Sequence, residues 1–520
     1  MQELVRKSTI RLFVVVIFVF LTISGIGFSL YLIYFGAHSA SMYAIAATFL
    51  VLSAVSGFFN VFTAYSYYRS AFYDEYLAKV TASTRPMSRY PTVAIAMPVY
   101  NEDVDSVERN MLRLKTVNYP KERLTFYLLD DSTNAATRRE LRRFAKASGI
   151  SYLHRSDRKG FKAGALNNML SRSKEDFIAI FDYDEYLTNQ DFLMDTLPYF
   201  GDKDLSYIQT EKRYFKGTFF SDTVDLFDAF FFKFIQPSRA LNNTAIFAGS
   251  CGIIRHAALD RIGGFPEYII EDTFFSYESD LHNFKSLYLP KVYAYGKPIL
   301  TFTELVKQQW RYNYGDTQFL MYFFRRSISG NGNSKKQSLL STIDYITHGF
   351  GLNYVSIMLI LFTLVSVFVI FEAHVPSSIT IQQLIQAQYI ATTIEILGIS
   401  TFVVSIIAPV VLTKMHFKSI RKGFMVFLLN FSLSFIRTRA AIAASLGTGP
   451  SFSWSRGGAI QGSGKTMKTL RRAFSETAFS SVLFMLGALA FIINNIYGAA
   501  WLIWYAALYL STFIFFYKYG

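Results

Sequence analysis

Long uncharged stretches at both ends of the 520-residue chain limit its architecture more than any other feature. Residues 12–34 carry no charged side chain, and residues 478–517 carry none over 40 positions. A helix needs about 20 apolar residues to cross a bilayer. The middle of the chain has an ordinary mixture of polar and apolar residues. The sequence therefore predicts membrane helices at both ends and a water-exposed domain between them.

The N-terminal end predicts a helical hairpin. A second apolar stretch, residues 42–68, follows the first after a short link, whereas a signal peptide would have a shorter apolar region. Arg6, Lys7 and Arg11 precede the first stretch, and Arg69 follows the second. Because Lys and Arg gather on the cytoplasmic side of membrane helices, we expect the N-terminus and the middle domain in the cytoplasm.

The C-terminal part predicts four more spans. Residues 350–371 suit a third span, and residues 389–413 suit a fourth with Glu395 near one end. The long uncharged stretch that follows is sufficient for two spans joined by a tight turn at Asn494 and Asn495. We therefore expect six spans, with both termini in the cytoplasm.

One apolar stretch is too short for a crossing. Residues 424–436 are apolar for only 13 positions, which fits a helix lying in the membrane interface. A crossing here would also place the cations between residues 456 and 472 outside the cytoplasm. The expected domains are a transmembrane hairpin at 1–75, a cytoplasmic domain at 90–335, and a transmembrane domain at 338–520 with a loop at 445–473.

Charge and cysteine content narrow the partners. A net charge of +15 suits a cytoplasmic face beside anionic lipid of the bilayer. No basic motif of a known nucleic-acid module is present, so we expect no nucleic-acid partner. Cys251 is the single cysteine, which excludes an intrachain disulfide and a cysteine metal cage.

The middle domain alternates strand-like and helix-like stretches. Residues 93–97, 126–129 and 177–181 are short apolar runs typical of buried strands, and residues such as 138–148 between them are helix-like. This alternation predicts a parallel α/β sheet. Ligands of such sheets bind beyond the carboxyl ends of the strands, where this chain places acidic residues.

Seven short motifs, in this order, resemble those of the family 2 glycosyltransferases. Four resemble the nucleotide-sugar half of the family: residues 98–102, 130–132, 159–167 and 182–184. Three resemble the acceptor half of its processive membrane members, which include the cellulose, hyaluronan and mannan synthases: residues 249–255, 271–272 and 308–312. The resemblance covers nearly the whole chain, because the apolar stretches fall where that family has its spans. It implies a GT-A-like α/β domain that binds a nucleotide sugar, with a multi-span α-helical membrane domain and interfacial helices.

Asp182 and Asp184 are the candidate metal ligands. They stand two residues apart at a strand end, so their side chains are expected to point the same way. Mg²⁺ and Mn²⁺ prefer oxygen ligands and bridge to phosphates. The metal would neutralise charge that develops on the leaving nucleoside diphosphate.

The resemblance assigns more residues to the nucleotide sugar. Asp130 and Asp131 match acids that contact the nucleotide, and Lys162 matches a basic residue at the same end. Tyr100 and Glu102 would line the pocket for base and ribose. Asp182, Gln308 and Arg311 complete the expected donor site.

The acceptor side needs a base, because inversion requires a group that removes a proton from the acceptor hydroxyl. Asp272 matches the family's base. Glu271 is the alternative, since adjacent side chains point apart and only one can face the acceptor. The segment formed by Gly249, Ser250 and Cys251 resembles the family's acceptor-binding segment.

Residues 308–312 pair a cation with an aromatic ring. Arg311 offers a planar fork of donors for the diphosphate, and Gln308 is expected to help orient ring and phosphates. Tyr312 stands where the family usually has a tryptophan beneath the acceptor sugar. A tyrosine also stacks on a sugar ring, but the departure bears on acceptor preference and processivity. Trp310 is not expected to replace that tryptophan.

A loop near the C-terminal spans resembles the family's gating loop, which closes over bound nucleotide. Its candidate residues are Phe452, Trp454 and Arg456. Residues 462–466 imitate a phosphate-binding loop, but Ala459 stands where that pattern requires glycine, and no strand precedes it. An ATPase is therefore excluded.

Together these features predict an inverting, processive glycosyltransferase with Mg²⁺ or Mn²⁺ as cofactor. It would transfer a sugar from a nucleotide diphosphate, with UDP-glucose favoured, to a growing β-linked polysaccharide that crosses the membrane. One alternative is a non-processive enzyme that glycosylates a lipid carrier or glycolipid, which the motif at 308–312 disfavours. Another is a transporter with a regulatory domain, which the acid-rich strand ends disfavour.

Overall fold

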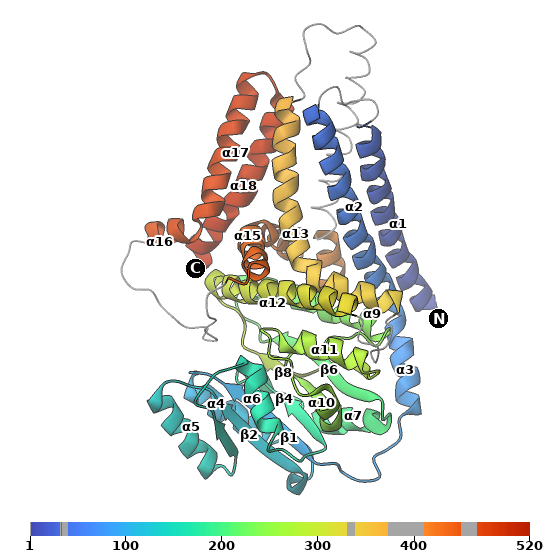
Figure 1. Ribbon diagram of the computed structural model, residues 1–520, viewed down its shortest axis with the longest axis vertical. Helices are drawn as coiled ribbons and strands as arrows, with labels where there is room; N and C mark the ends of the chain where they lie inside the picture. The colour runs from blue at the N-terminus through green and yellow to red at the C-terminus, as the bar shows by residue number, and fades with distance from the viewer. Residues whose placement is uncertain (1, 32, 34–39, 330–337, 373–409, 449–464) are drawn as a thin grey trace.

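The computed structural model describes residues 2–31, 33, 40–329, 338–372, 410–448 and 465–520. A layer of long helices lies at one end of the molecule, and an α/β domain lies at the other (Figure 1). Between them, α12 and α15 run across the direction of the long helices (Figure 1). The long helices are α1 (Gln2–Tyr31), α2 (Ala40–Arg69), α13 (Leu339–Glu372), α17 (Phe474–Ile492) and α18 (Ile496–Tyr519).

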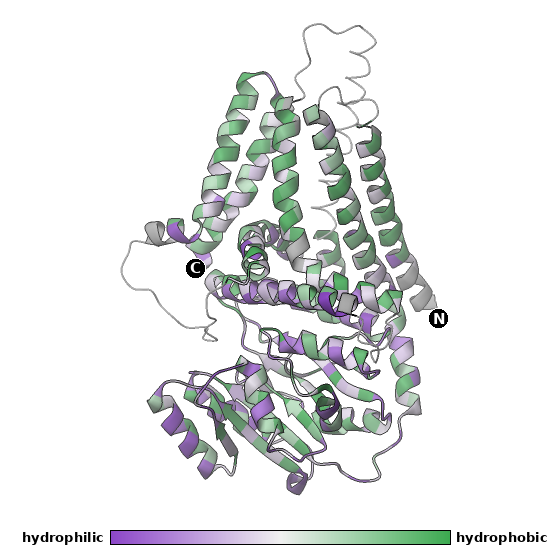
Figure 2. Ribbon diagram, viewed as in Figure 1, coloured by the Kyte–Doolittle hydropathy of each residue, from purple (hydrophilic) through white to green (hydrophobic). Residues whose placement is uncertain are grey.

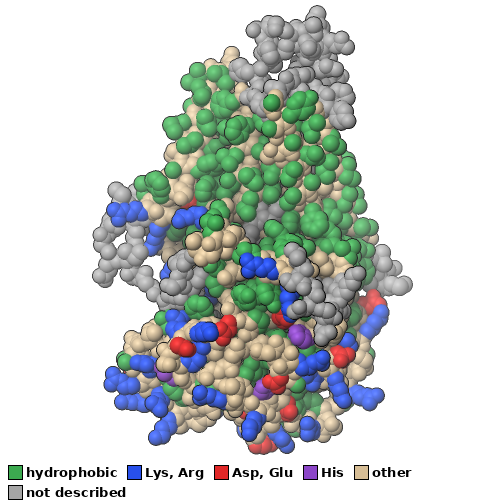
Figure 3. Space-filling view, viewed as in Figure 1, with side chains coloured by type: hydrophobic (Ala, Val, Ile, Leu, Met, Phe, Trp, Pro, Cys, Tyr) green, Lys and Arg blue, Asp and Glu red, His purple; other side chains and the backbone are tan. Residues whose placement is uncertain are grey.

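The surface divides the molecule in the same way. The long helices are predominantly hydrophobic, whereas polar residues concentrate in the α/β domain and the helices beside it (Figure 2). Apolar side chains cover the upper half of the molecule, and most Lys and Arg lie on the lower half (Figure 3). Phe13 and Phe20 of α1 are 65% and 67% exposed, and Met485 of α17 is 62% exposed. Such a large exposed apolar surface fits contact with lipid.

Four described helices are long and apolar enough to cross a membrane, or five if one bent pair forms a single span. In α1, the apolar helical stretch Arg11–Gly27 is shorter. The span expected at residues 389–413, with Glu395, lies almost entirely outside the described residues. The turn expected at Asn494 and Asn495 is confirmed, because it joins α17 to α18.

The expected interfacial stretch lies within α15 (Ile420–Ser445), a 26-residue helix whose length and composition would also allow a crossing. Figure 1 shows α15 nearly end-on, across the direction of α17 and α18. It packs against α12 (Phe302–Ser329), α13 and α18. This direction agrees with an interfacial helix, whose position relative to a bilayer stays a prediction.

The α/β domain is built on one eight-stranded sheet with the order β3-β2-β1-β4-β7-β6-β8-β5. The first four strands in this order are parallel, as predicted. β7 is antiparallel to both neighbours, so the sheet is mixed rather than wholly parallel. The strands are β1 (Val93–Val99), β2 (Leu124–Asp130), β3 (Ser151–His154), β4 (Phe177–Ile180), β5 (Glu185–Leu187), β6 (Leu205–Tyr214), β7 (Gly252–Arg255) and β8 (Lys285–Gly296).

Both faces of the sheet are buried. Val93, Ile95 and Met97 of β1 join one hydrophobic cluster, and Ala94 and Ala96 join another on the opposite face. A strand covered on both faces needs no polar alternation, which explains the continuous apolar runs in the sequence. The helices around the sheet are α3 (Tyr73–Ser83), α4 (Val104–Leu114), α5 (Ala135–Ala147), α6 (Phe161–Leu170), α7 (Phe192–Thr196), α8 (Phe219–Phe230), α9 (Gln236–Ala240), α10 (His256–Ile262) and α11 (Glu271–Leu281).

Candidate active site

The two acids at the end of β2 are bound by groups of the protein itself. The Asp130 carboxylate accepts hydrogen bonds from the Ser132 backbone N–H at 2.8 Å and from the Tyr152 hydroxyl at 2.6 Å. Asp131 forms a two-pronged ion pair with Arg155, whose Nε lies 2.9 Å from Asp131 Oδ1. All four donors are fixed by neighbouring strands or turns. The two carboxylates are thus held rigidly at the edge of the sheet where a nucleotide was expected.

Arg155 extends this arrangement to the next helix. Its guanidinium also donates to the carbonyl oxygens of Lys159 and Phe161, each at 2.9 Å. Gly160, with φ of +71°, turns the chain between those two residues into α6. Arg155 therefore couples Asp131 to the start of α6, the helix that carries Lys162.

Tyr100 and Glu102 follow β1, close to the same edge. The guanidinium carbon of Arg158 lies 3.3 Å from the centre of the Tyr100 ring, so a cation already stacks on this aromatic side chain. Glu102 lines a pocket of about 660 Å³, together with Asp184. Arg109 of α4 and Lys297 add positive charge to the lining of this pocket. A volume of this size is typical of sites for small ligands and cofactors.

The two candidate metal ligands face different surroundings. Lys162 donates to Asp182 Oδ1 at 2.7 Å and to the Gly249 carbonyl at 2.9 Å. Burial would raise the pKa of Asp182, but the charges of Lys162 and Lys212 outweigh it and hold that pKa well below its usual range. Asp184 instead lines the pocket described above. The structure therefore brings Asp182 to the lysines and Asp184 to the open pocket.

Ser250 and Cys251 lie against the same buried charges. The Ser250 hydroxyl lies 3.0 Å from Asp182 Oδ2 and 2.6 Å from Glu185 Oε1. Lys212 donates to Ser250 Oγ at 2.6 Å. Cys251 is buried, and burial raises the pKa of its thiol well above the usual value, so this thiol is not a reactive thiolate.

The candidate bases Glu271 and Asp272 begin α11, and Glu271 is 5% exposed. Burial and the neighbouring Asp272 raise the pKa of Glu271 to about 8. Burial likewise raises the pKa of Asp272, whose Oδ1 accepts from the Thr273 backbone N–H at 2.8 Å. A raised pKa lies closer to neutral pH, where a carboxyl group can both accept and release a proton, and this favours proton transfer.

Asp272 lies beside the segment that carries Ser250. A methyl carbon built on Gly249 would lie 2.9 Å from Asp272 Oδ2 and 3.6 Å from Lys162 Nζ. Gly249 also has φ of +81°, so a side chain here would be strained as well as crowded. The structure thus brings Asp182, Lys162, Gly249 and Asp272 into one site, in which Lys162 is buried and the two aspartates are partly exposed.

The motif at residues 308–312 lies on α12. The Arg311 guanidinium lies 5.4 Å from the Tyr312 ring, and the Gln308 amide donates to the Tyr312 hydroxyl at 3.3 Å. Burial raises the pKa of Tyr312, with Arg311 and Asp272 also acting on it electrostatically. Trp310 packs instead against α15.

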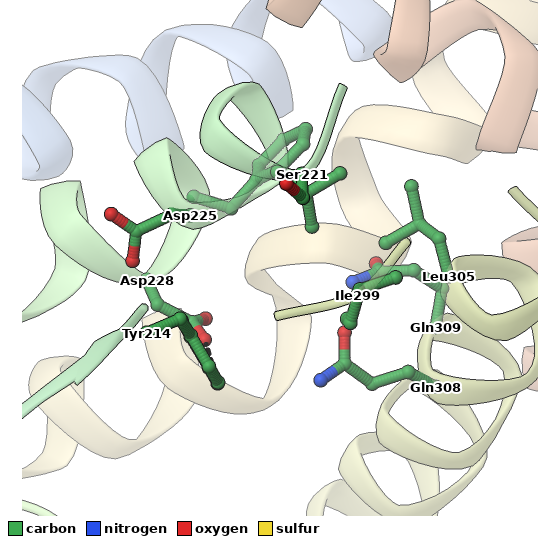
Figure 4. Close-up of a pocket in the computed structure, with 10 residues that line it drawn as sticks. Tyr214, Ser221, Asp225, Asp228, Ile299, Leu305, Gln308 and Gln309 are labelled. Atoms are coloured by element: carbon green, nitrogen blue, oxygen red, sulfur yellow. Dashed lines mark hydrogen bonds between the residues drawn. The ribbon is translucent and has the colours of Figure 1, made fainter. Parts of the chain in front are cut away.

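A second, much smaller pocket lies between α8 and α12. Figure 4 shows Asp225, Asp228 and Tyr214 on one side of it, and Gln308 and Gln309 on the other. The Tyr214 hydroxyl donates to Asp228 Oδ2 at 2.6 Å. Its volume of about 10 Å³ admits roughly one water molecule. In this conformation the pocket is too small for a sugar.

Within the described part of the chain, no three His, Cys, Asp or Glu side chains gather as a metal site. The oxygen ligands of Asp182 and Asp184 still suit a hard cation, whose other ligands would come from a nucleotide diphosphate. Phe452, Trp454 and Arg456 of the expected gating loop lie outside the described residues.

Sequence reasoning missed three charged residues of the site: Arg155, Glu185 and Lys212. Arg155 and Lys212 belong to none of the recognised motifs, so nothing in the sequence marked them. Glu185 directly follows Asp184, and an acid beside two candidate ligands was an available signal. Each of these side chains meets a partner from a distant part of the chain. Only the folded sheet shows which residues meet.

Comparison with known proteins identifies the α/β domain. Residues 94–263 match the model described as glycosyl transferase family 2. The cellulose synthase catalytic subunit of Pseudomonas fluorescens is 29% identical over 247 residues, which cover 46% of this chain and 33% of that protein. The corresponding subunit of Xanthomonas axonopodis pv. citri is 28% identical over 237 residues, covering 44% of this chain and 32% of that protein. The chain thus spans about a third of the length of these curated relatives.

Among solved structures, a mannosyltransferase from Pyrobaculum calidifontis superposes with a TM-score of 0.49 and 16% identity. The match covers 76% of this chain and 99% of that chain. Similarity at this level carries no argument about substrate.

Proposed function

We propose that this glycosyltransferase, whose residues 94–263 form a family 2 domain, extends a β-linked polysaccharide by processive transfer with inversion. The donor would be a nucleotide diphosphate sugar, with UDP-glucose favoured, and the product would cross the membrane during synthesis. The proposal includes six spans and a cytoplasmic α/β domain. Support for the donor comes from cellulose synthase catalytic subunits that are 28% and 29% identical to parts of this chain and whose names describe them as UDP-forming.

One observation carries the proposal. The donor acid Asp182 and the candidate base Asp272 both lie beside Lys162 and Gly249, although the four residues come from distant parts of the sequence. A sugar held at Asp182 would therefore lie close to a carboxylate able to accept a proton. Proximity of this kind supplies much of the rate enhancement of bimolecular reactions.

The roles of the residues follow from this placement. Asp272 removes the proton from the acceptor hydroxyl, and Glu271 is the alternative base. Arg311 binds the diphosphate through its planar fork, and Tyr312 stacks beneath the acceptor sugar. Glu102 and Asp184 line the pocket that would hold the nucleotide.

The remaining candidate residues have supporting roles. Lys162 orients Asp182, and Asp130 and Asp131 shape the edge of the nucleotide site together with Tyr100. Residues 249–251 support the acceptor. Asp182 and Asp184 would hold Mg²⁺ or Mn²⁺, which neutralises charge on the leaving diphosphate when bound.

Incubation of the purified full chain with Mg²⁺ or Mn²⁺ and each radiolabelled nucleotide sugar in turn tests the proposal. We expect one donor to give polymer that only a matching linkage-specific hydrolase digests. A product of one or two added sugars on a lipid would support the alternative, glycosylation of a lipid carrier. Failure of every nucleotide sugar to react would refute both.

A further inference from the structure

A buried ion pair, Glu185 with Lys212, lies beside the proposed donor acid. Glu185 begins β5, and its side chain is nearly inaccessible. Its Oε2 accepts from the Asp182 backbone N–H at 2.9 Å, and its Oε1 lies 2.6 Å from Ser250 Oγ and 3.2 Å from Lys212 Nζ. One carboxylate therefore joins three segments: the loop after β4, the strand β6, and residues 249–251.

Lys212 of β6 binds the same segments that Glu185 joins. Glu185, Lys212, Lys162, Asp182 and residues 249–251 are called the unit below. Its Nζ donates to Ser250 Oγ at 2.6 Å and to the Ala248 carbonyl at 3.3 Å, and lies 3.9 Å from Asp182 Oδ2. Burial alone would lower the pKa of Lys212, but Glu185 and Asp182 raise it well above the usual value.

The charges within the unit balance. Lys162 and Lys212 supply two positive charges, and Asp182 and Glu185 supply two negative charges. Without Glu185, Lys212 would lose its nearer carboxylate partner and keep the more distant Asp182. Without Lys212, two carboxylates that share the Ser250 hydroxyl would repel each other. Either loss would shift Asp182 and Ser250 together.

Such a shift would reach the candidate base. Residues 249–251 contact Asp272 through Gly249, whose added methyl carbon would lie 2.9 Å from Asp272 Oδ2. A displacement of about 1 Å at a reacting centre costs on the order of 100-fold in rate. The ion pair is therefore connected to the donor acid Asp182 directly and to the candidate base Asp272 through residues 249–251.

We propose that Glu185 and Lys212 are positioning residues for glycosyl transfer, which fix Asp182 and residues 249–251 as one unit and so set the distance from donor to base. This inference rests on the proposed function. Neither side chain lines the 660 Å³ pocket that holds Glu102 and Asp184. The pair should therefore act mainly on the transfer step, with a smaller effect on nucleotide affinity through Asp182.

The test uses the purified full chain and the variants Glu185→Gln, Lys212→Met and their combination. For each single variant we expect kcat to fall on the order of 100-fold, with much smaller changes in donor KM and UDP affinity. The melting temperature should fall as well, because removal of one partner leaves the other charge unpaired. The double variant should lose no more activity than the worse single variant, because the two residues act as a unit.

Two further variants make the result decisive. Glu211→Gln is the matched control, since Glu211 precedes Lys212 on β6 and forms its own ion pair with Arg213 at 2.7 Å. It should keep normal kcat. Glu185→Asp keeps the charge but shortens the side chain, and it answers the question if Glu185→Gln fails to fold. We expect its kcat to fall about tenfold, because shortening the side chain should displace Asp182 less than complete loss of the ion pair does.

Normal kcat in the folded Glu185 and Lys212 variants would overturn the positioning role, and so would additive losses in the double variant. A rise in donor KM alone would also overturn it, because it would place the pair in nucleotide binding. These outcomes all require an active unchanged protein. If that protein transfers no sugar from any donor, the proposed function itself fails.

Discussion

The acids at the end of β2 and the acids at the start of α11 are both candidate site residues, yet the protein surrounds them in different ways. Asp130 and Asp131 are each matched by donors of the protein, the Tyr152 hydroxyl and the Arg155 fork among them. Every carboxylate oxygen has a fixed partner there. This is how a protein holds an acid in place as part of its framework.

At α11 the arrangement is reversed. Glu271 is buried and the adjacent Asp272 is partly exposed, and desolvation raises the pKa of both. Lys162 is shared between them and Asp182 rather than assigned to one acid. Groups with crowded like charges and shifted pKa values concentrate where proton transfer occurs. From this difference we propose that the α11 acids take part in the chemistry and that the β2 acids shape the site.

We expect the largest effect from Asp272→Asn, which tests whether an α11 acid is the base. A general base contributes about 100-fold to 10,000-fold, so we expect kcat to fall by that factor with UDP affinity unchanged. Initial rates of UDP release measure it. Asp260→Asn on α10 is the control, because its carboxylate is largely exposed. Normal kcat in Asp272→Asn would transfer the role of base to Glu271.

Asp184→Asn should give the next largest effect. Asp184 lines the large pocket, where a nucleotide diphosphate and its cation would lie, so we expect it to be a ligand of that cation. A bound cation supplies several kcal/mol, and each 1.36 kcal/mol is tenfold, so we expect a loss of about 100-fold. Calorimetric titration of UDP with and without Mn²⁺ gives an independent readout. Equal UDP affinity with and without Mn²⁺ in the unchanged protein would contradict the metal role.

Sequence reasoning located the sheet and the acids because both depend on local pattern. The apolar run at residues 93–97 and the acids at Asp130 and Asp182 needed only strand periodicity and position. The predicted helix at 138–148 is also confirmed, although α5 begins earlier because the Asn134 side chain caps it. Short-range rules therefore covered the donor half of the site well.

The partners of those acids could not be predicted in the same way. Arg155 meets Asp131 beyond the ends of two parallel strands, and Lys212 on β6 meets Glu185 on β5, two strands that flank β8. Strand order decides these encounters, and no local spacing encodes it. For the same reason, the sequence suggested that Asp182 and Asp184 point the same way, whereas the lysines draw one of them inward.

The raised pKa of Glu271 also predicts how the stability of the protein depends on pH. Burial raises the pKa of Glu271 from 4.5 to about 8, so the folded protein holds this proton more tightly than the unfolded chain does. The associated stability is fully present below about pH 4.5 and is lost as the pH rises through about 8. We expect Glu271→Gln to reduce this loss by a few kcal/mol. Melting temperatures from pH 5 to about pH 9 measure it, and identical slopes in both proteins would contradict it.

The smallest effect belongs to the β2 acids. Asp130→Asn weakens the bonds to Tyr152 and Ser132, so we expect unfolding free energy to fall by about 1–3 kcal/mol while kcat stays close to normal. Denaturant titration followed by tyrosine and tryptophan fluorescence gives the first quantity, and UDP release gives the second. A loss of UDP affinity with unchanged stability would mean that Asp130 binds the nucleotide directly. Both groups of acids would then take part in binding or catalysis. The number of hydrogen-bond partners of an acid would not by itself distinguish a structural acid from a functional one.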